Sequence, residues 1–153
     1  MVANARSRGG APVHVRKLVM GFIAGFIAVL LFHQPALAVL AKIGFVQAGT
    51  YSMAAAGPLH VPQVVSLAFW GGVWGVLFAA IEHRFPRGAM YWVYALAFGA
   101  ILPSLVAWFV VAPMKGLPMA AGWQASRMAT GLIINGAWGV GTALLFSLTR
   151  RIG

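Results

Sequence analysis

The chain has 153 residues, of which 61% are hydrophobic and only 8% are charged, and its formal net charge is +10. A soluble domain has about 45–50% apolar and about 25% charged residues, so this composition indicates a membrane protein. Glu82 is the only carboxylate side chain, and the chain contains no cysteine. Within one chain, this excludes a catalytic carboxylate pair, a carboxylate cage for Mg²⁺ or Ca²⁺, a disulfide framework and a thiol nucleophile. We therefore expect a protein that is not an enzyme and that carries no metal and no cofactor.

Four apolar stretches are long enough to cross a bilayer core, which needs about 20 residues of helix. Taken in chain order, they cover residues 18–41, 61–81, 89–112 and 128–149. The predicted fold class is therefore all-α, a transmembrane bundle of four helices over residues 18–149. We expect a basic tail at residues 1–17 before the bundle and a short basic end at residues 150–153 after it.

Basic residues predict the orientation of this bundle. Most of the Lys and Arg residues lie on one side: Arg6, Arg8, Arg16, Lys17, Arg84, Arg87, Arg150 and Arg151. The other side holds Lys42, Lys115 and Arg127. The positive-inside rule then predicts that both termini lie in the cytoplasm. We expect the membrane to be the inner membrane of a bacterium. Because the charges flank apolar runs instead of striping a soluble face, we expect anionic lipid headgroups at the cytoplasmic face as partners, and no nucleic acid.

The first apolar stretch has two alternative interpretations. Its basic start, its apolar run and "ALA" at residues 36–38 are typical of a secretory signal with a cleavage site. However, the apolar run continues past this point to Lys42, which makes the stretch long enough to span. The acid-free N-terminus also has the composition of an organellar transit peptide, but a bacterial N-terminus that faces the cytoplasm needs the same arginines.

A short sequence echo links the second and fourth stretches. "GGVWGV" begins at Gly71, and "NGAWGV" begins 64 residues later at Asn135. The first and third stretches each carry a late proline, Pro35 and Pro103. This pattern predicts two tandem helical hairpins of the same orientation. Glycine and alanine stripes at helical spacing predict close packing of these helices on one another, and a docking face for another protein is the alternative.

Polar groups gather at one depth of the predicted bundle. His33 lies eight residues before Ala41, which is about 12 Å of helix. Residues at nearly the same level bring a polar group from every stretch: Gln34, Trp70, Ser104 and Asn135. Together with His33 they form a candidate polar layer. The layer is either hydrogen-bonded glue between the helices or a small binding site or polar path.

Several chemistries can be considered for His33. A b-type haem needs a second axial ligand, for which His60 is the only other histidine on that side. Zinc needs three or four protein ligands, and none cluster here. A hydrolase dyad of Ser104 and His33 lacks an orienting acid and a glycine-rich nucleophile motif. A quinone or a lipid headgroup in contact with His33, Trp70 and Asn135 is favoured over these.

Charged residues outside the layer have simpler interpretations. Glu82 begins "EHR" between the second and third stretches, and we interpret Glu82, Arg84 and Arg87 as an interfacial charge cluster that fixes the helix ends. An inner gate or a docking contact is the alternative. Arg127 is expected to reach the outer interface or to bind anionic headgroups. The apolar loops at 42–60 and 113–127 are expected to lie at the interface, to cap the polar layer or to face a partner.

Four segments carry a family resemblance: "GFIAGFIAVLLFHQ", "LAFWGGVWGVLF", "LPSLVAWFVVAPMKG" and "INGAWGVGTALL". They resemble small four-helix membrane proteins of bacteria whose function is unassigned. The resemblance covers residues 18–148 and implies no activity and no site. The residues themselves favour a non-enzymatic accessory or assembly partner of a membrane complex. The alternative is a small passive conduit or a lipid- or quinone-binding protein that uses the layer around His33 and Asn135, alone or as a homo-oligomer.

Overall fold

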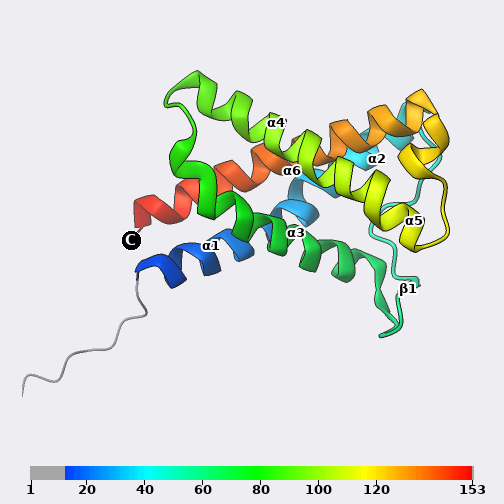
Figure 1. Cartoon of the computed structure of the whole chain (residues 1–153), viewed down its shortest axis with the longest axis horizontal. Coiled ribbons are helices and arrows are strands. Elements are labelled where there is room, and N and C mark those ends of the chain that lie inside the picture. The colour runs from blue at the N-terminus through cyan, green and yellow to red at the C-terminus, as the bar shows by residue number, and fades with distance from the viewer. Residues whose placement is uncertain (1–12, 153) are drawn as a thin grey trace, which may run out of the picture.

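Four long helices account for most of the described chain (Figure 1). The computed structural model describes the backbone of residues 13–152 and the side chains of residues 14–149. The segments His14–Lys42, Gln63–Arg84, Ala89–Met114 and Ala125–Thr149 are each long and apolar enough to cross a membrane. This confirms the expected all-helical class with four helices of spanning length. Residues 1–12 of the predicted basic tail and the side chains of the basic C-terminal end lie outside the described residues.

One π-helical turn interrupts the first segment and another interrupts the third. The first segment consists of α1 (Val13–Ala28), the π-turn η1 (Val29–His33) and α2 (Gln34–Lys42). The third consists of α4 (Ala89–Val106), the π-turn η3 (Ala107–Val111) and α5 (Ala112–Met114). The second is α3 (Gln63–Ile81), extended by the 3₁₀ turn η2 (Glu82–Arg84), and the fourth is α6 (Ala125–Ile152).

The helix edges differ from the predicted ones in several places, and the fourth helix extends three residues beyond the predicted stretch at each end. α1 begins at Val13, inside the predicted basic tail, because long cationic side chains on a helix can reach the membrane surface. Residues 61–62 form a short strand, and α3 starts only after Pro62, whose backbone is extended. The third helix continues past Pro113, because a proline in the first turn of α5 needs no N–H.

Each π-turn ends two residues before a proline, η1 before Pro35 and η3 before Pro113. A proline has no N–H to donate, and its ring crowds the carbonyl four residues earlier, so the preceding turn widens. The following residue then donates to a carbonyl five residues back: Gln34 N–H to Val29 O, and Ala112 N–H to Ala107 O. Pro103 lies inside α4 instead. The proline that corresponds to Pro35 in this respect is therefore Pro113, and not Pro103 as the sequence echo suggested.

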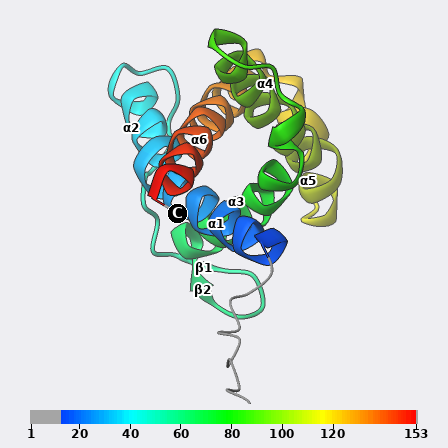
Figure 2. The same cartoon turned by 90° about the vertical axis from the view of Figure 1, so that its left-hand side faces the viewer.

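The helices associate closely as two pairs, α1 with α3 and α4 with α6, and α1 also packs against α6 (Figure 2). In the first pair, Gly75 lies so close to Gly21 that a Cβ there would overlap the carbonyl oxygen of Gly21. In the second pair, Gly139 lies in the same way against the carbonyl oxygen of Ala95. Small residues let helix backbones approach closely where no hydrophobic effect drives association. The small-residue stripes therefore pack within the chain.

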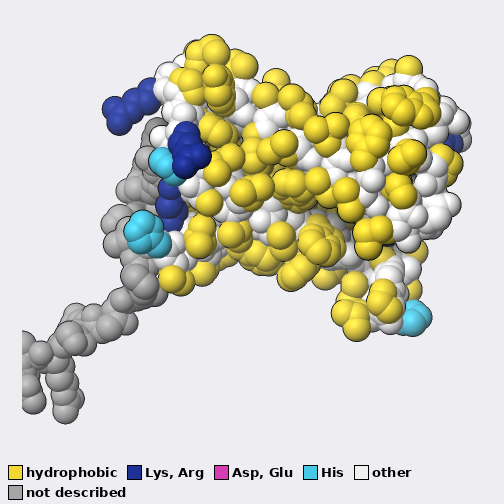
Figure 3. All heavy atoms as spheres, viewed as in Figure 1, with side chains coloured by type: hydrophobic (Ala, Val, Ile, Leu, Met, Phe, Trp, Pro, Cys, Tyr) yellow, Lys and Arg dark blue, Asp and Glu magenta, His cyan; other side chains and the backbone are white. Residues whose placement is uncertain are grey.

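The bundle has two different ends. The start of α1, the turn after α3 and the end of α6 lie together at the left of Figure 1, which we call the terminus end. The loops at residues 43–62 and 115–124 lie at the right, which we call the loop end. Figure 3 shows Lys, Arg and His side chains gathered at the terminus end and a hydrophobic surface over the middle of the bundle. A hydrophobic surface along the helices that is bounded by basic residues at one end is expected of helices that face lipid.

Aromatic rings fill the interior toward the terminus end. Phe78 and Phe146 are almost fully buried. The ring of Phe78 lies 5.5, 5.6 and 6.2 Å from the rings of Phe98, Phe85 and Phe146. These contacts are edge-to-face, the arrangement that aromatic rings prefer. Trp138 Nε1–H donates to Gly25 O over 2.9 Å, which joins the second helix pair to the first.

The two loops are ordered against the helices. Strand β1 (Ala55–Ala56) pairs antiparallel with β2 (Val61–Pro62), and the loop before it accepts hydrogen bonds from the first turn of α3. Between α5 and α6, the turn η4 (Met119–Trp123) has a positive φ at Ala120, Ala121, Gly122 and Trp123. Consecutive non-glycine residues in this conformation are strained, so tertiary contacts must hold the turn in place.

Candidate functional site

A pocket of about 400 Å³ lies near the loop end, and we call it the loop-end pocket. All four helical segments and the first loop contribute to its lining: His33, Gln34, Leu37, Ala48, Gly49, Ser52, Gln63, Leu67, Ala107, Trp108, Gly131, Ile134 and Asn135. A few polar side chains thus meet in a cavity that is otherwise lined by apolar residues and glycine. This is the composition of sites that bind small organic ligands.

The π-turn η1 brings two consecutive polar residues to this pocket. His33 is the last residue of η1 and Gln34 the first of α2, and their exposed fractions are 9% and 2%. A π-turn shifts the residues around it relative to a regular helix, so both neighbours reach one cavity. Gln34 Nε2 lies 3.5 Å from His33 Nδ1. With the amide donating to Nδ1, the neutral ring carries its hydrogen on Nε2.

Tyr51 fastens the first loop over this pair. Its backbone N–H donates to Gln34 Oε1 over 2.8 Å, and its hydroxyl donates to Leu30 O over 2.7 Å. The carbonyl of Leu30 is available because Gln34 N–H donates to Val29 and Pro35 has no N–H. Hydrogen bonds therefore link the loop to the π-turn, at a carbonyl that Pro35 leaves without its usual donor.

Asn135 and Ser104 form the polar contact of the second helix pair. Asn135 Nδ2 donates to Ser104 Oγ over 2.9 Å. Ser104 is fully buried, whereas Asn135 is partly buried and lines the pocket. Because the amide nitrogen of Asn135 donates to Ser104, the side-chain oxygen of Asn135 is the atom that can accept a hydrogen bond from a ligand. The pocket therefore offers a donor at His33 and an acceptor at Asn135.

Trp70, grouped with this layer by its depth, does not join it. Its side chain is 58% exposed, its ring packs against Phe69 at 5.8 Å, and it does not line the pocket. Depth along a helix sets the level of a residue but not the face on which it lies. The interpretation by depth therefore fails for Trp70, while it brings Ser104 and Asn135 together.

The sequence argument missed several residues of the pocket. Trp108 belongs to η3, and the signal for that turn is Pro113 two residues after its end. Gly131 leaves space beside it, since a Cβ there would lie 3.5 Å from the Trp108 ring. Ser52 comes from the first loop and Gln63 from the start of α3. The path of an irregular loop has no periodicity from which these contacts could be predicted.

The other chemistries considered for His33 find little support in the geometry. No group of three or more His, Cys, Asp or Glu side chains that could hold a metal occurs among the described residues. His60, the second ligand a haem would need, is exposed and its Nδ1 lies 3.1 Å from Pro58 O. A nucleophilic Ser104 needs a base within hydrogen-bond reach, and its partner is Asn135. What the pocket offers a ligand is hydrogen bonding.

The charge cluster at the terminus end is organised around Glu82. Its side chain is 4% exposed, and Oε1 lies 3.3 Å from Lys17 Nζ. Arg84 and Arg87, the predicted companions, are exposed on the turn that follows α3. The ion pair joins η2 to α1, so it connects two helix ends, with Lys17 as a partner that sequence spacing did not single out.

No protein-family model, curated protein or solved structure matches the chain. The fold and the site define its class, a protein with four helices of membrane-spanning length around a polar pocket near one end.

Proposed function

We propose that the protein is a non-enzymatic membrane protein that binds a small lipid-soluble ligand in the loop-end pocket. One observation carries this proposal: His33, Gln34 and Asn135 meet in one cavity of about 400 Å³. Pockets for small molecules have volumes of about 300–1,000 Å³, apolar walls and a few well-placed polar groups. A layer of pure structural glue would bury its polar groups against one another without such a cavity.

The polar atoms of the pocket favour a ligand with both a carbonyl and a hydroxyl group. His33 Nε2–H can donate to a carbonyl, and the oxygen of Asn135 can accept from a hydroxyl. A quinone with its quinol, or the headgroup of a lipid, has this chemistry. The Trp108 indole adds an apolar surface on which such a ring or chain can lie.

A binding pocket is favoured over a passive conduit. Trp138 lies one helical turn beyond Asn135 toward the terminus end and is 3% exposed. Phe78 and Phe146 fill the next levels of the bundle. A water-filled path needs a continuous lining of polar groups. These rings instead occupy the interior between the pocket and the terminus end.

The distribution of basic residues supports termini in the cytoplasm and a location in a bacterial inner membrane. Arg16, Lys17, Arg84 and Arg87 belong to the terminus end, and Lys42, Lys115 and Arg127 belong to the loop end. The positive-inside rule then directs the terminus end to the cytoplasm. In this orientation the loop-end pocket opens in the outer half of the membrane.

The packing also supports our proposal that the chain consists of two tandem hairpins. Gly75 and Gly139 are 64 residues apart, and each makes the close crossing of its pair. Leu67 and Gly131 are separated by the same interval and both line the loop-end pocket. The pocket would then lie between equivalent positions of two repeats, where membrane proteins built from repeats often place a ligand.

A role as an accessory partner of a membrane complex is the second candidate, and one observation favours it. The most exposed large hydrophobic side chains gather at the loop end: Leu59 at 83%, Met114 at 81%, Met53 at 70%, Trp123 at 69% and Ile43 at 68%. Exposed apolar residues beyond the ends of spanning helices mark contact with lipid or with another protein. The docking face of this candidate is therefore the loop end and not the small-residue stripes.

The test is purification from native membranes in a mild detergent, followed by solvent extraction and mass spectrometry of bound small molecules. We expect a stoichiometric ligand in the wild-type protein and about a tenfold loss in Asn135→Leu, since a lost hydrogen bond to a ligand has that size. Thr142→Val is the matched control, because Thr142 is buried in the same helix and does not line the pocket. It should retain the ligand.

The remaining outcomes separate the candidates. A folded Asn135→Leu variant that keeps its ligand contradicts the binding proposal. Unfolding of both Asn135→Leu and His33→Leu assigns the layer to helix packing alone. A stoichiometric protein partner without a bound small molecule supports the accessory role.

A further inference from the structure

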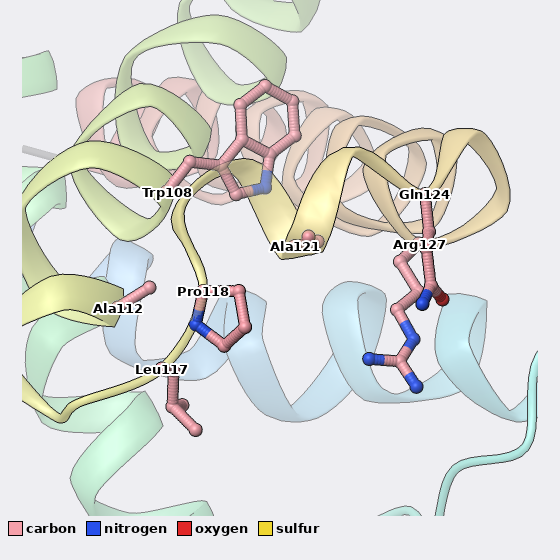
Figure 4. A pocket seen from close by; sticks show the side chains of 8 residues that line it. Trp108, Ala112, Leu117, Pro118, Ala121, Gln124 and Arg127 are labelled. Carbon is pink, nitrogen blue, oxygen red and sulfur yellow. The ribbon is translucent and has the colours of Figure 1, made fainter.

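A second pocket, of about 260 Å³, lies at the loop end beside Arg127, and we call it the Arg127 pocket. Gln124 and Arg127 line one side of it, and Ala112, Leu117 and Pro118 line the other. Figure 4 shows Arg127 and Gln124 extending from the start of α6, opposite Leu117 and Pro118. The pocket thus has one cationic side and one apolar side.

The charge of Arg127 is not neutralised by a carboxylate side chain at this end of the protein. Glu82 is the only acidic side chain in the sequence, and it pairs with Lys17 at the terminus end. Lys42 and Lys115 add further positive charge at the loop end. A guanidinium stays protonated in proteins, and Arg127 is exposed, so it can pair with an anion from outside the chain.

We propose that the Arg127 pocket binds the phosphate group of an anionic phospholipid. Arg127 holds two phosphate oxygens with its planar fork of N–H groups, and Gln124 donates a further hydrogen bond. Leu117 and Pro118 contact the glycerol and the first acyl carbons. Free phosphate shares the headgroup chemistry, but it would leave this apolar side empty.

The position of the pocket fits this occupant. It lies where helices of membrane-spanning length end, which is the depth of phospholipid headgroups. The amide groups in the first turn of α6 add partial positive charge on the same side. Trp108, which lines the pocket, is of the residue type that membrane proteins place at headgroup level. The site is separate from the loop-end pocket, although Trp108 lines both.

The test is native mass spectrometry of the full chain in a nonionic detergent, titrated with phosphatidylglycerol or phosphatidylcholine of the same acyl chains. We expect tighter binding of the anionic lipid and about a tenfold weaker affinity in Arg127→Gln, because one charge-assisted bidentate contact is lost. Lys115→Gln removes the same charge at the same end but outside the pocket. It should change the affinity less than about twofold.

Two further variants separate specific binding from general attraction. Arg127→Lys keeps the charge but loses the fork, so its affinity should fall between wild type and Arg127→Gln. Ala112→Leu narrows the apolar side without changing charge, and it should weaken lipid binding while leaving the weak binding of inorganic phosphate unchanged. Thermal unfolding of each variant checks that the fold is intact.

Three results would overturn the proposal. Equal losses in Arg127→Gln and Lys115→Gln indicate diffuse attraction. Phosphatidylcholine that binds as tightly as phosphatidylglycerol shows that anionic charge is not recognised. Inorganic phosphate that displaces the lipid at an equal concentration, with no effect of Ala112→Leu, assigns the pocket to free phosphate.

Discussion

The two helix pairs are closed by the same contact. In the first pair, Gly75 of α3 lies against the backbone of Gly21 and Gly25 of α1. In the second pair, Gly139 of α6 lies against Gly99 of α4. A Cβ added to Gly99 would lie 2.5 Å from the carbonyl oxygen of Asn135 in α6. Both crossings therefore depend on the absence of a side chain at the point where two backbones meet.

The pairs differ one turn nearer the loop end, where the first has Gly71 and the second has Asn135. A Cβ at Gly71 would overlap the side chain of Val29, so at this level the two helices of the first pair are in direct apolar contact. Asn135 instead donates to Ser104 and lines the loop-end pocket. At this position the first pair therefore makes an apolar contact and the second pair makes a polar one.

The two pairs also differ toward the terminus end. Phe78 of α3 and Glu82 of η2 stand 64 residues before Thr142 and Phe146 of α6, and all four are buried. The aromatic ring of Phe78 in the first pair therefore corresponds to the hydroxyl of Thr142 in the second. The carboxylate of Glu82 corresponds to the aromatic ring of Phe146. At the first of these two positions the polar group belongs to the second pair, and at the next it belongs to the first pair.

Enlarging the glycine at each crossing should have the largest effect. A Cβ at Gly75 would overlap Gly21 O, and one at Gly139 would overlap Ala95 O. Because a backbone carbonyl cannot turn aside, each alanine variant should lower the free energy of unfolding by about 3 kcal/mol. Thermal unfolding in detergent measures this, with Gly49→Ala as the control because Gly49 has open space around it. Destabilisation of only one variant would show that the crossings are not equivalent.

Removing the charge of Glu82 tests the feature in which the first pair differs at the terminus end. Glu82→Gln should lower the free energy of unfolding by about 2 kcal/mol, since it breaks a largely buried ion pair with Lys17. The loss in the double variant with Lys17→Gln should be smaller than the sum of the single losses, because both changes remove the same contact. Strictly additive losses would mean that the two residues act independently.

The sequence was sufficient to predict the helices but not all of their faces. Uninterrupted apolar runs bounded by basic residues and prolines predict four spans, since a bilayer demands that length of helix. Trp70 shows the limit, because its depth matches the pocket while its side chain lies on the outside of α3. Which face is buried depends on the neighbouring helix, and the nearly uniform apolarity of a span leaves no amphipathic pattern to indicate it.

The same limit applies to the candidate site. Depth alone brought Asn135 and Ser104 together, because a polar group in a span requires a partner at its own level. Tyr51 and Trp108 could not be placed in this way. The π-turn before Pro35 frees the carbonyl of Leu30 for the hydroxyl of Tyr51, and the π-turn before Pro113 shifts the helix register around Trp108.

Exchanging Asn135 for glycine gives the second pair the residue of the first. The lost hydrogen bond and the added helical glycine should together lower the free energy of unfolding by about 1.5 kcal/mol. Binding of the small ligand should weaken about tenfold in the same extraction assay. Ser104→Ala is the control, since it removes the contact between helices but leaves the oxygen of Asn135 in the pocket. Equal loss of ligand in both variants would mean that Asn135 acts only through helix packing.

The smallest expected effect is a gain in stability at Thr142, where the first pair has Phe78. The hydroxyl of Thr142 is buried and has no hydrogen-bond partner among the described residues. Thr142→Val keeps the shape and removes the unpaired group, so the free energy of unfolding should rise by about 1 kcal/mol. In Thr130→Val, a hydroxyl that donates to Ser126 O over 2.8 Å is lost, and no gain is expected. A loss at Thr142 would show that its hydroxyl is satisfied in the membrane, and that the second pair is polar at this level as well as at the pocket.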